Sequence, residues 1–268
     1  MYNIVLLALE DCLASSLYGL ADAFHLANAY AASSLQHPEK RFSWKVLSLD
    51  GGPVKACGGI QLHSEGRFDQ AADPHLIYIP GINYQGKANF DSWLDKHRIL
   101  LPWLRTQSHT SLIAANCSGT FLLAESGVLD RCNAATSWWL AGQFRQRYPG
   151  IKLKNEEALV VNERSYCAGP MTSYLDLALH VIDKEISPNI AEQCAKSMAL
   201  SLGSSVTPPF QSMFDQITSD DALVSGTQHW LLNHLSEQIE LPEVARLMGT
   251  SQRTLTRRFK DQLELTPK

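Results

Sequence analysis

The segment Ser111–Ala124, SLIAANCSGTFLLA, decides the fold that we predict for most of this chain. It has the pattern of a short buried strand over Ser111–Asn116, a sharp turn at Cys117 and an apolar helix from about Thr120. A tight turn from strand to helix is the geometry of a nucleophile elbow. It would place the Cys117 thiol at the carboxyl end of a strand, which is the edge where open α/β sheets bind their ligands.

Strands and helices alternate on both sides of this segment. Tyr2–Leu9 and Leu76–Gly81 are continuous apolar runs, as expected of buried parallel strands, and residues 15–30 have helical periodicity. This alternation predicts an α/β fold with a doubly wound parallel sheet and helices on both of its faces. A short hairpin is expected over Val54–Ser64, with two adjacent glycines at its turn.

Composition limits the kind of protein that this can be. The chain has 268 residues, 45% of them hydrophobic, which suffices for one large core and a smaller domain. The six cysteines form no C-x-x-C pair, which favours a reducing cytoplasm over a disulfide framework or a zinc site. The N-terminus lacks signal-peptide features, and no apolar run approaches the length of a membrane span. We therefore expect a cytoplasmic protein without a metal, a cofactor or a membrane partner.

The clearest linker in the chain is Gly203–Phe210, which is rich in Ser and Pro. We divide the sequence into an α/β domain over 1–203, a linker over 204–219 and a small all-α domain over 220–268. The charges divide in a similar way. From Leu241 onward six basic and three acidic residues give a net charge of +3, which leaves −7 for the rest of a chain with net charge −4. Such asymmetry suits a DNA-binding end on an acidic body.

Residues 241–260, LPEVARLMGTSQRTLTRRFK, have the pattern of two short helices around a tight turn. Gly249 supplies the left-handed turn residue, and the small Ala245 lets the helices approach closely. Apolar residues at helical spacings would close the core between them: Val244, Met248, Leu255 and Phe259. The second helix carries a basic, hydroxyl-bearing face, which is what reading of the DNA major groove requires.

That second helix would make two kinds of DNA contact. We expect the base edges to be read by Gln252, Arg253, Thr256 and Arg257. We expect the phosphates to be contacted by Thr254, Arg258 and Lys260. The alternative is a solvated helix face that has no partner.

The elbow also predicts a pocket in the large domain. The dipole of the following helix would lower the pKa of the Cys117 thiol and favour the thiolate. Backbone amides of Ser118, Gly81 and Ile82 would line an anion or oxyanion pocket. One of two adjacent tryptophans, Trp138 in our assignment, would lie beside it, although burial of both in the core is an alternative. The alternative for the thiol is a small residue packed at a tight turn.

Several of these segments resemble known families. Residues 1–186 resemble the flavodoxin-like fold of the class I glutamine amidotransferase-like proteins, in the PfpI-like branch. Residues 228–268 resemble the first helix-turn-helix of an AraC/XylS-type regulator. The first resemblance rests on the first strand and on Pro80-Gly81, Asn116–Ala124, Gly127–Asp130 and Ala135–Trp139.

Together the two resemblances indicate an AraC-type regulator that carries an amidase-like sensor domain. They imply a transcriptional regulator with promoter DNA and a small-molecule effector as partners, acting as a homodimer. AraC-type domains resemble two helix-turn-helix units joined by a long helix, and this chain ends at Lys268, where that helix would begin. Either the chain has been shortened or half of the DNA-reading unit remains, and with half of the phosphate contacts we expect a DNA affinity that is reduced and sensitive to salt.

The chain departs from the enzymes of this fold near the elbow. Enzymes place a histidine close to the nucleophile, but Ser118 follows the cysteine here, and Trp138 stands where related regulators have histidine. The acid of the first helix region falls on Ser16, with Glu10 and Asp11 nearby as substitutes. A thiol without an oriented base or acid is a poor hydrolase, so the resemblance implies a pocket that binds and does not catalyse.

Two other functions stay open at this point. One is a cysteine-dependent amidase, peptidase or glyoxalase-like enzyme that uses Cys117 and carries a DNA-binding appendage. The other is a sensor fragment that acts by dimerising with full-length partners. The histidines add little, because four of them fall in expected loops or element ends, where a solvated ring is the usual state: His63, His75, His97 and His109.

Overall fold

The computed structural model describes residues 1–34, 39–154, 156–200, 219 and 221–267. The predicted linker, 204–219, lies outside these ranges apart from Ser219. Buried apolar residues form two separate cores, one within residues 4–195 and one within residues 224–259. None of the helices in the described ranges combines the length and the apolar composition that a bilayer span demands.

The elements have the following bounds. The strands are β1 (Tyr2–Leu7), β2 (Phe42–Leu47), β3 (Val54–Lys55), β4 (Gln61–Leu62), β5 (Leu76–Ile79), β6 (Leu112–Asn116), β7 (Asn133–Ala134), β8 (Lys152–Leu153), β9 (Leu159–Val161) and β10 (Ser165–Ala168). The α-helices are α1 (Ala14–Ser33), α2 (Lys87–Lys96), α3 (Leu100–Gln107), α4 (Gly119–Glu125), α5 (Ala141–Arg147), α6 (Tyr174–Glu185), α7 (Pro188–Ser197), α9 (Ala222–Asn233), α10 (Leu241–Leu247) and α11 (Gln252–Leu263). A short 3-10 helix, η3 (Trp138–Leu140), precedes α5.

One six-stranded sheet organises the large domain, with the strand order β2-β1-β5-β6-β10-β9. The first five strands are parallel, and β9 pairs antiparallel with β10 at the edge. Counted in chain order, the five parallel strands have the 2-1-3-4-5 arrangement of flavodoxin-like folds. The predicted doubly wound α/β fold is therefore confirmed.

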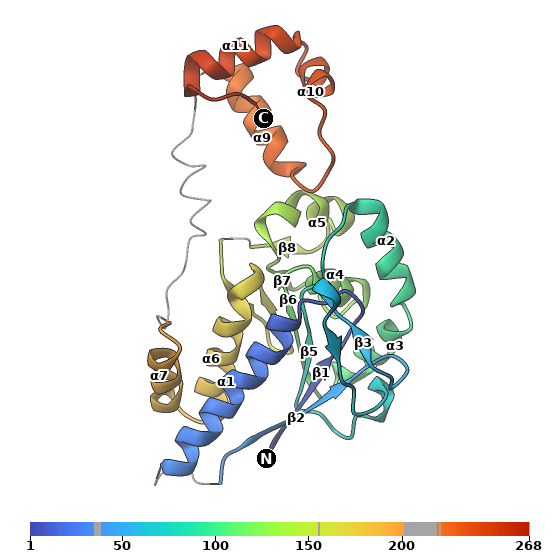
Figure 1. Ribbon diagram of the computed structural model, residues 1–268, viewed down its shortest axis with the longest axis vertical. Coiled ribbons are helices and arrows are strands. Elements are labelled where there is room, and N and C mark those ends of the chain that lie inside the picture. Colours follow the sequence, from blue (N-terminus) through green and yellow to red (C-terminus); the bar gives the residue numbers. More distant parts are fainter. Residues whose placement is uncertain (35–38, 155, 201–218, 220, 268) are drawn as a thin grey trace.

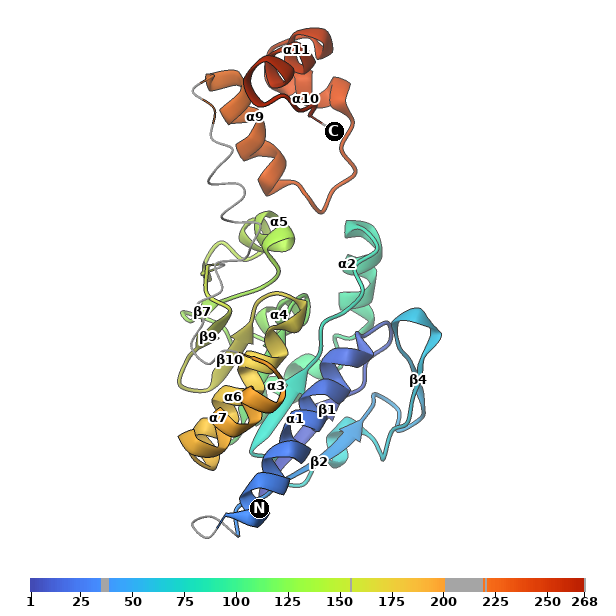
Figure 2. The same ribbon diagram turned by 60° about the vertical axis from the view of Figure 1, so that its left-hand side comes forward.

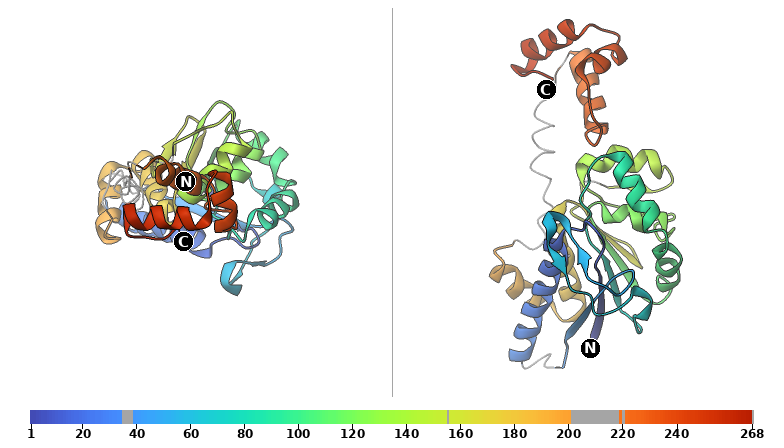
Figure 3. Two further views of the ribbon diagram at one scale, coloured as in Figure 1. Left: turned by 90° about the horizontal axis from the view of Figure 1, so that it is seen from above. Right: turned by 45° about the vertical axis from the view of Figure 1, so that its right-hand side comes forward.

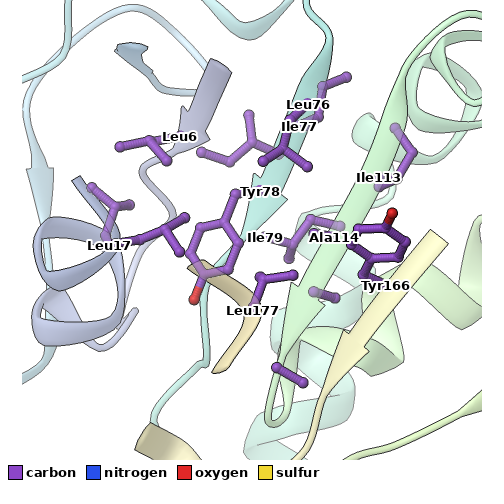
Figure 4. Packing of buried hydrophobic residues seen from close by; sticks show 14 of the residues in the cluster. Leu6, Leu17, Leu76, Ile77, Tyr78, Ile79, Ile113, Ala114, Tyr166 and Leu177 are labelled. Carbon is purple, nitrogen blue, oxygen red and sulfur yellow. The ribbon is translucent and has the colours of Figure 1, made fainter. Parts of the chain in front are cut away.

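Helices cover both faces of this sheet (Figure 1). Helices α1, α6 and α7 pack together over one face, and α3 and α4 cover the other. Because β5 is buried on both sides, its successive side chains enter two different layers. Tyr78 points toward Leu17 of α1 and Leu177 of α6 (Figure 4). Each large apolar side chain buried in this way contributes about 1.5–3 kcal/mol to folding.

The helical domain has a small core of its own. Val224 of α9, Val244 and Ala245 of α10, and Leu255 and Phe259 of α11 are buried against one another. The predicted turn is present, since Gly249 has a φ of +65°. The Ser251 hydroxyl begins α11 by accepting a hydrogen bond from the backbone N–H of Thr254, at 3.1 Å. Figure 2 shows α9, α10 and α11 grouped apart from the sheet.

The expectation of a solvated His97 is wrong. The ring is fully buried at the end of α2, stacked on Trp93 with ring centroids 3.8 Å apart, and its Nδ1 lies 2.7 Å from the Trp93 carbonyl oxygen. Burial lowers the pKa of His97 to about 4, because the charged imidazolium is poorly solvated there. A turn position in the sequence gave no sign that the folded chain would cover this ring.

We expect His97 to make the protein sensitive to acid. Its pKa is near 6.5 when unfolded and about 4 when folded, so the unfolded state binds more protons between these values. The stability that the neutral His97 contributes is fully present above pH 6.5. It is lost as the pH falls toward 4, and the loss is roughly 3 kcal/mol at most. Urea unfolding as a function of pH should show a shallower loss over this window in His97→Gln than in the wild type. The exposed His63→Gln is the control, and equal slopes in all three proteins would contradict the prediction.

Candidate effector site and DNA-binding helix

The Cys117 elbow is held in a left-handed conformation, with a φ of 57° at a residue that is not glycine. Such a backbone costs roughly 1–2 kcal/mol and persists only where its surroundings enforce it. The Cys117 N–H donates to the Ala168 carbonyl at 2.9 Å, and the Thr136 hydroxyl donates to the Cys117 carbonyl at 2.7 Å. Both hydrogen bonds fix the peptide groups around the turn. Cys117 therefore stands at a sharp turn between β6 and α4.

Gly119 is required for this turn by close packing. A Cβ at that position would lie 2.3 Å from the Pro80 carbonyl oxygen and 3.1 Å from a side-chain carbon of Ile79. Since the Pro80 carbonyl is backbone at the end of β5, it has no side-chain freedom with which to move away. Helix α4 therefore begins directly against the end of the neighbouring strand.

We expect Gly119→Ala to destabilise the protein by roughly 3 kcal/mol or more, because the added methyl group would overlap backbone atoms, which cannot move aside as a flexible side chain can. Gly226→Ala is the matched control, since its Cβ would meet nothing within 4 Å on the exposed surface of α9. That change should stabilise by about 0.5–1 kcal/mol. Chemical unfolding of the two variants measures the difference. A Gly119→Ala protein as stable as the wild type would show that the turn does not require a glycine at this position.

The Cys117 thiol is buried, with 4% of the residue exposed. Its Sγ lies 2.7 Å from the Ser137 hydroxyl oxygen, and either group can be the donor. Burial raises the pKa of Cys117, against the smaller lowering effect of the hydrogen bonds from Ser137 and Ser118. The sequence led us to expect a lowered pKa from the α4 dipole. Desolvation of the thiolate by burial is the largest cause of the raised pKa.

The residues predicted to line a pocket do come together, but they bind one another. The Ile82 N–H donates to the Ser118 hydroxyl at 2.7 Å, and that hydroxyl donates in turn to the Ile82 carbonyl at 2.7 Å. The amide expected to receive an anion is thus satisfied within the chain. Gly81 packs against the elbow, since a Cβ on it would lie 3.2 Å from that of Cys117. Trp138 is half-buried in η3, directly after Ser137.

Two of the positions considered for an acid near the elbow, Ser16 and Glu10, have other partners. Ser16, in the position of the family's acid, is buried and donates its hydroxyl to the Leu13 carbonyl at 2.9 Å. Glu10 pairs with Lys96 on α2, and this hydrogen bond lowers the pKa of the Glu10 carboxyl. Among the described residues, no group of three or more His, Cys, Asp or Glu side chains is arranged to hold a metal ion.

Sequence reasoning missed Thr136 and Ser137, which contact the elbow directly. A signal was present, because both lie in the Ala135–Trp139 segment that carried the family resemblance. Their role was hidden because they are distant from Cys117 in sequence and reach it only through folding.

Helix α11 presents the predicted DNA-reading face. Gln252, Arg253, Arg257 and Lys260 are exposed, and Thr256 is half-exposed beside them. Two of the predicted phosphate contacts have partners within the domain. The Arg258 guanidinium pairs with Asp221, which also caps the N-terminus of α9. The Thr254 hydroxyl lies 2.9 Å from that of Ser251 in the cap of α11. Which of these residues touch DNA stays a prediction.

Known proteins resemble this chain in sequence or in fold. No protein-family profile matches it. The HTH-type transcriptional regulator CdhR of Pseudomonas aeruginosa is 25% identical over 231 residues, covering 84% of this chain and 66% of CdhR. The HTH-type transcriptional regulator GbdR of the same species is 23% identical over 271 residues, covering 99% of this chain and 69% of GbdR.

The homologues of this chain are HTH-type transcriptional regulators. The chain spans about two thirds of their length. An AraC family transcriptional regulator from Pseudomonas putida has a TM-score of 0.58 at 18% identity, covering 74% of this chain and all of that one. A THiJ/PfpI family protein from Pseudomonas syringae has a TM-score of 0.59 at 16% identity, covering 88% and 90%. Both structures share the α/β fold that the sequence predicted, and both relatives named above are regulators of the HTH type.

Proposed function

We propose that this chain is a DNA-binding transcriptional regulator of the AraC type, in which α11 reads promoter DNA. The exposed basic face of α11 carries this proposal: Gln252, Arg253, Thr256, Arg257 and Lys260. Helix α11 also lies at the end of the molecule that is remote from the sheet (Figures 1 and 3). A duplex would reach this face without meeting the α/β domain.

Charge supports the same role. Helix α11 carries four basic side chains and one acidic one, whereas the chain as a whole has a net charge of −4. A local basic face on an acidic protein attracts the DNA phosphates, whereas the acidic remainder of the chain repels them. This would bring the duplex to α11 in preference to the rest of the surface.

We expect Arg253→Ala/Arg257→Ala to abolish specific DNA binding, because each base contact is worth about 1–3 kcal/mol. Fluorescence anisotropy with the DNA upstream of the gene, and with a scrambled duplex, at low and moderate salt measures this. The control is Arg98→Ala/Arg105→Ala, which removes two exposed positive charges from the α/β domain. Equal binding of both double variants, or no preference of the wild type for the upstream duplex, would overturn the proposal.

We also propose that the α/β domain senses a small molecule and does not catalyse. The raised pKa of Cys117, its hydroxyl partner Ser137 and the pairing of Glu10 with Lys96 support this, since none of them activates a thiol. The elbow geometry at Cys117 is the observation that favours the enzyme alternative. That an effector contacts Cys117, Ser118, Gly81, Ile82 or Trp138 stays a prediction.

The reactivity of Cys117 distinguishes the sensor from the enzyme. At pH 7 we expect iodoacetamide to modify Cys117 more slowly than the half-buried Cys57, because a raised pKa keeps the thiol protonated and burial excludes the reagent. The rate at Cys117 should rise only above the ordinary pKa of a thiol. Short pulses followed by peptide mass spectrometry measure both sites, and unfolded protein is the control. Faster modification of Cys117 than of Cys57 would favour the enzyme.

A homodimer in a reducing cytoplasm completes the proposal. Two-fold operators pair with two-fold proteins, so two copies would place two α11 helices in successive major grooves. The cysteines of the structure are all free thiols, which suits that compartment.

A further inference from the structure

The two domains meet at a contact built on Tyr84, in the connection between β5 and α2. Its hydroxyl donates a hydrogen bond to the backbone carbonyl of Ser236, 3.0 Å away, in the loop between α9 and α10. Its ring packs edge-on against Trp139 of η3, with ring centroids 5.2 Å apart. Both η3 and α5 also contact α9. Figure 3 shows the lower end of α9 above α5. We call Tyr84 and Trp139 the aromatic pair.

The aromatic pair is joined to the elbow by two short stretches of chain. Ile82 exchanges two hydrogen bonds with Ser118, and it lies two residues before one member of the pair. Ser137 contacts the Cys117 thiol, and it lies two residues before the other member. The two partners of the elbow therefore lead directly to the two aromatic rings that touch each other. A displacement at the elbow would reach the pair along both stretches.

Polar side chains from both domains line a cavity beside this contact. Its volume is about 520 Å³, and its lining includes Lys87 and Gln146 from the α/β domain and His234 and Glu237 from the helical domain. Small polar interfaces between domains permit relative motion. A docking equilibrium of this kind is what a modest signal can shift.

We propose that the aromatic pair is the docking surface of the α/β domain for the DNA-binding domain of the same chain, and that the elbow controls its occupancy. Docking holds the α9–α10 end against the α/β domain while α11 faces outward. Only one consequence rests on the proposed function, namely that docking determines how α11 is presented to DNA. The docking and its control by the elbow are properties of the chain alone.

The docking is tested by the distance between spin labels on non-natural amino acids at exposed Glu163 and Asp261, which leaves the native cysteines untouched. In Tyr84→Phe we expect a second, longer population, with the ratio of docked to undocked molecules reduced about fivefold, the factor set by one neutral hydrogen bond. Tyr18→Phe, which removes an exposed hydroxyl on α1, should retain the wild-type distribution. An unchanged distribution in Tyr84→Phe would overturn the docking surface.

The control by the elbow is tested in the same labelled chain. We expect Ser118→Ala and Ser137→Ala each to produce the longer population, although the hydroxyls of both bind partners within the α/β domain, Ile82 and Cys117. Circular dichroism shows which variants fold. If Ser118→Ala does not fold, the distance distribution of Ser137→Ala tests the control by the elbow. Folded variants with the wild-type distribution would overturn the control by the elbow. Because no DNA is present, a failure of promoter binding would overturn the proposed function and leave this result unaffected.

Discussion

The missing Cβ of Gly119 is the constraint on which the site depends. With hydrogen in place of a side chain, the start of α4 rests against the Pro80 carbonyl at the end of β5. Cys117, two residues earlier, has a left-handed backbone, and Ser118 between them binds Ile82. Neighbouring parallel strands end at the same edge of a sheet, so the residues that follow β5 and β6 meet at this contact.

Burial has a larger effect than a helix dipole on the protonation state of the Cys117 thiol. A dipole at a helix end contributes about 0.3–1 kcal/mol, up to about 2 in favourable geometry. Full burial shifts a pKa by as much as about 3–5 units, at 1.36 kcal/mol each. Cys117 is almost completely enclosed, and its pKa is raised accordingly. The same fold can therefore hold a reactive cysteine or an inert one, according to how much water and which partners surround the thiol.

The two ends of the molecule have different physical designs. The elbow is a buried cluster in which Ser118 binds Ile82 and Ser137 contacts Cys117, whereas α11 offers charged side chains to solvent. Between them Tyr84 binds the Ser236 carbonyl of the helical domain and packs against Trp139. An enclosed site and an exposed basic helix, joined through the contact at Tyr84, would suit a protein that changes the arrangement of its domains and keeps each domain intact.

The sequence by itself determined the elements and their class. Continuous apolar runs at β1, β5 and β6 indicate strands buried on both faces, and the spacing of Val244, Leu255 and Phe259 indicates a helical hairpin with its own core. Local periodicity suffices for this because burial repeats with the geometry of each element. The tertiary structure alone decided the partners: Ser118 with Ile82, Ser137 with Cys117, the enclosure of His97 and the contact of Tyr84 with Ser236. These residues are far apart along the chain, and the solvation that sets their chemistry exists only once the layers have packed around them.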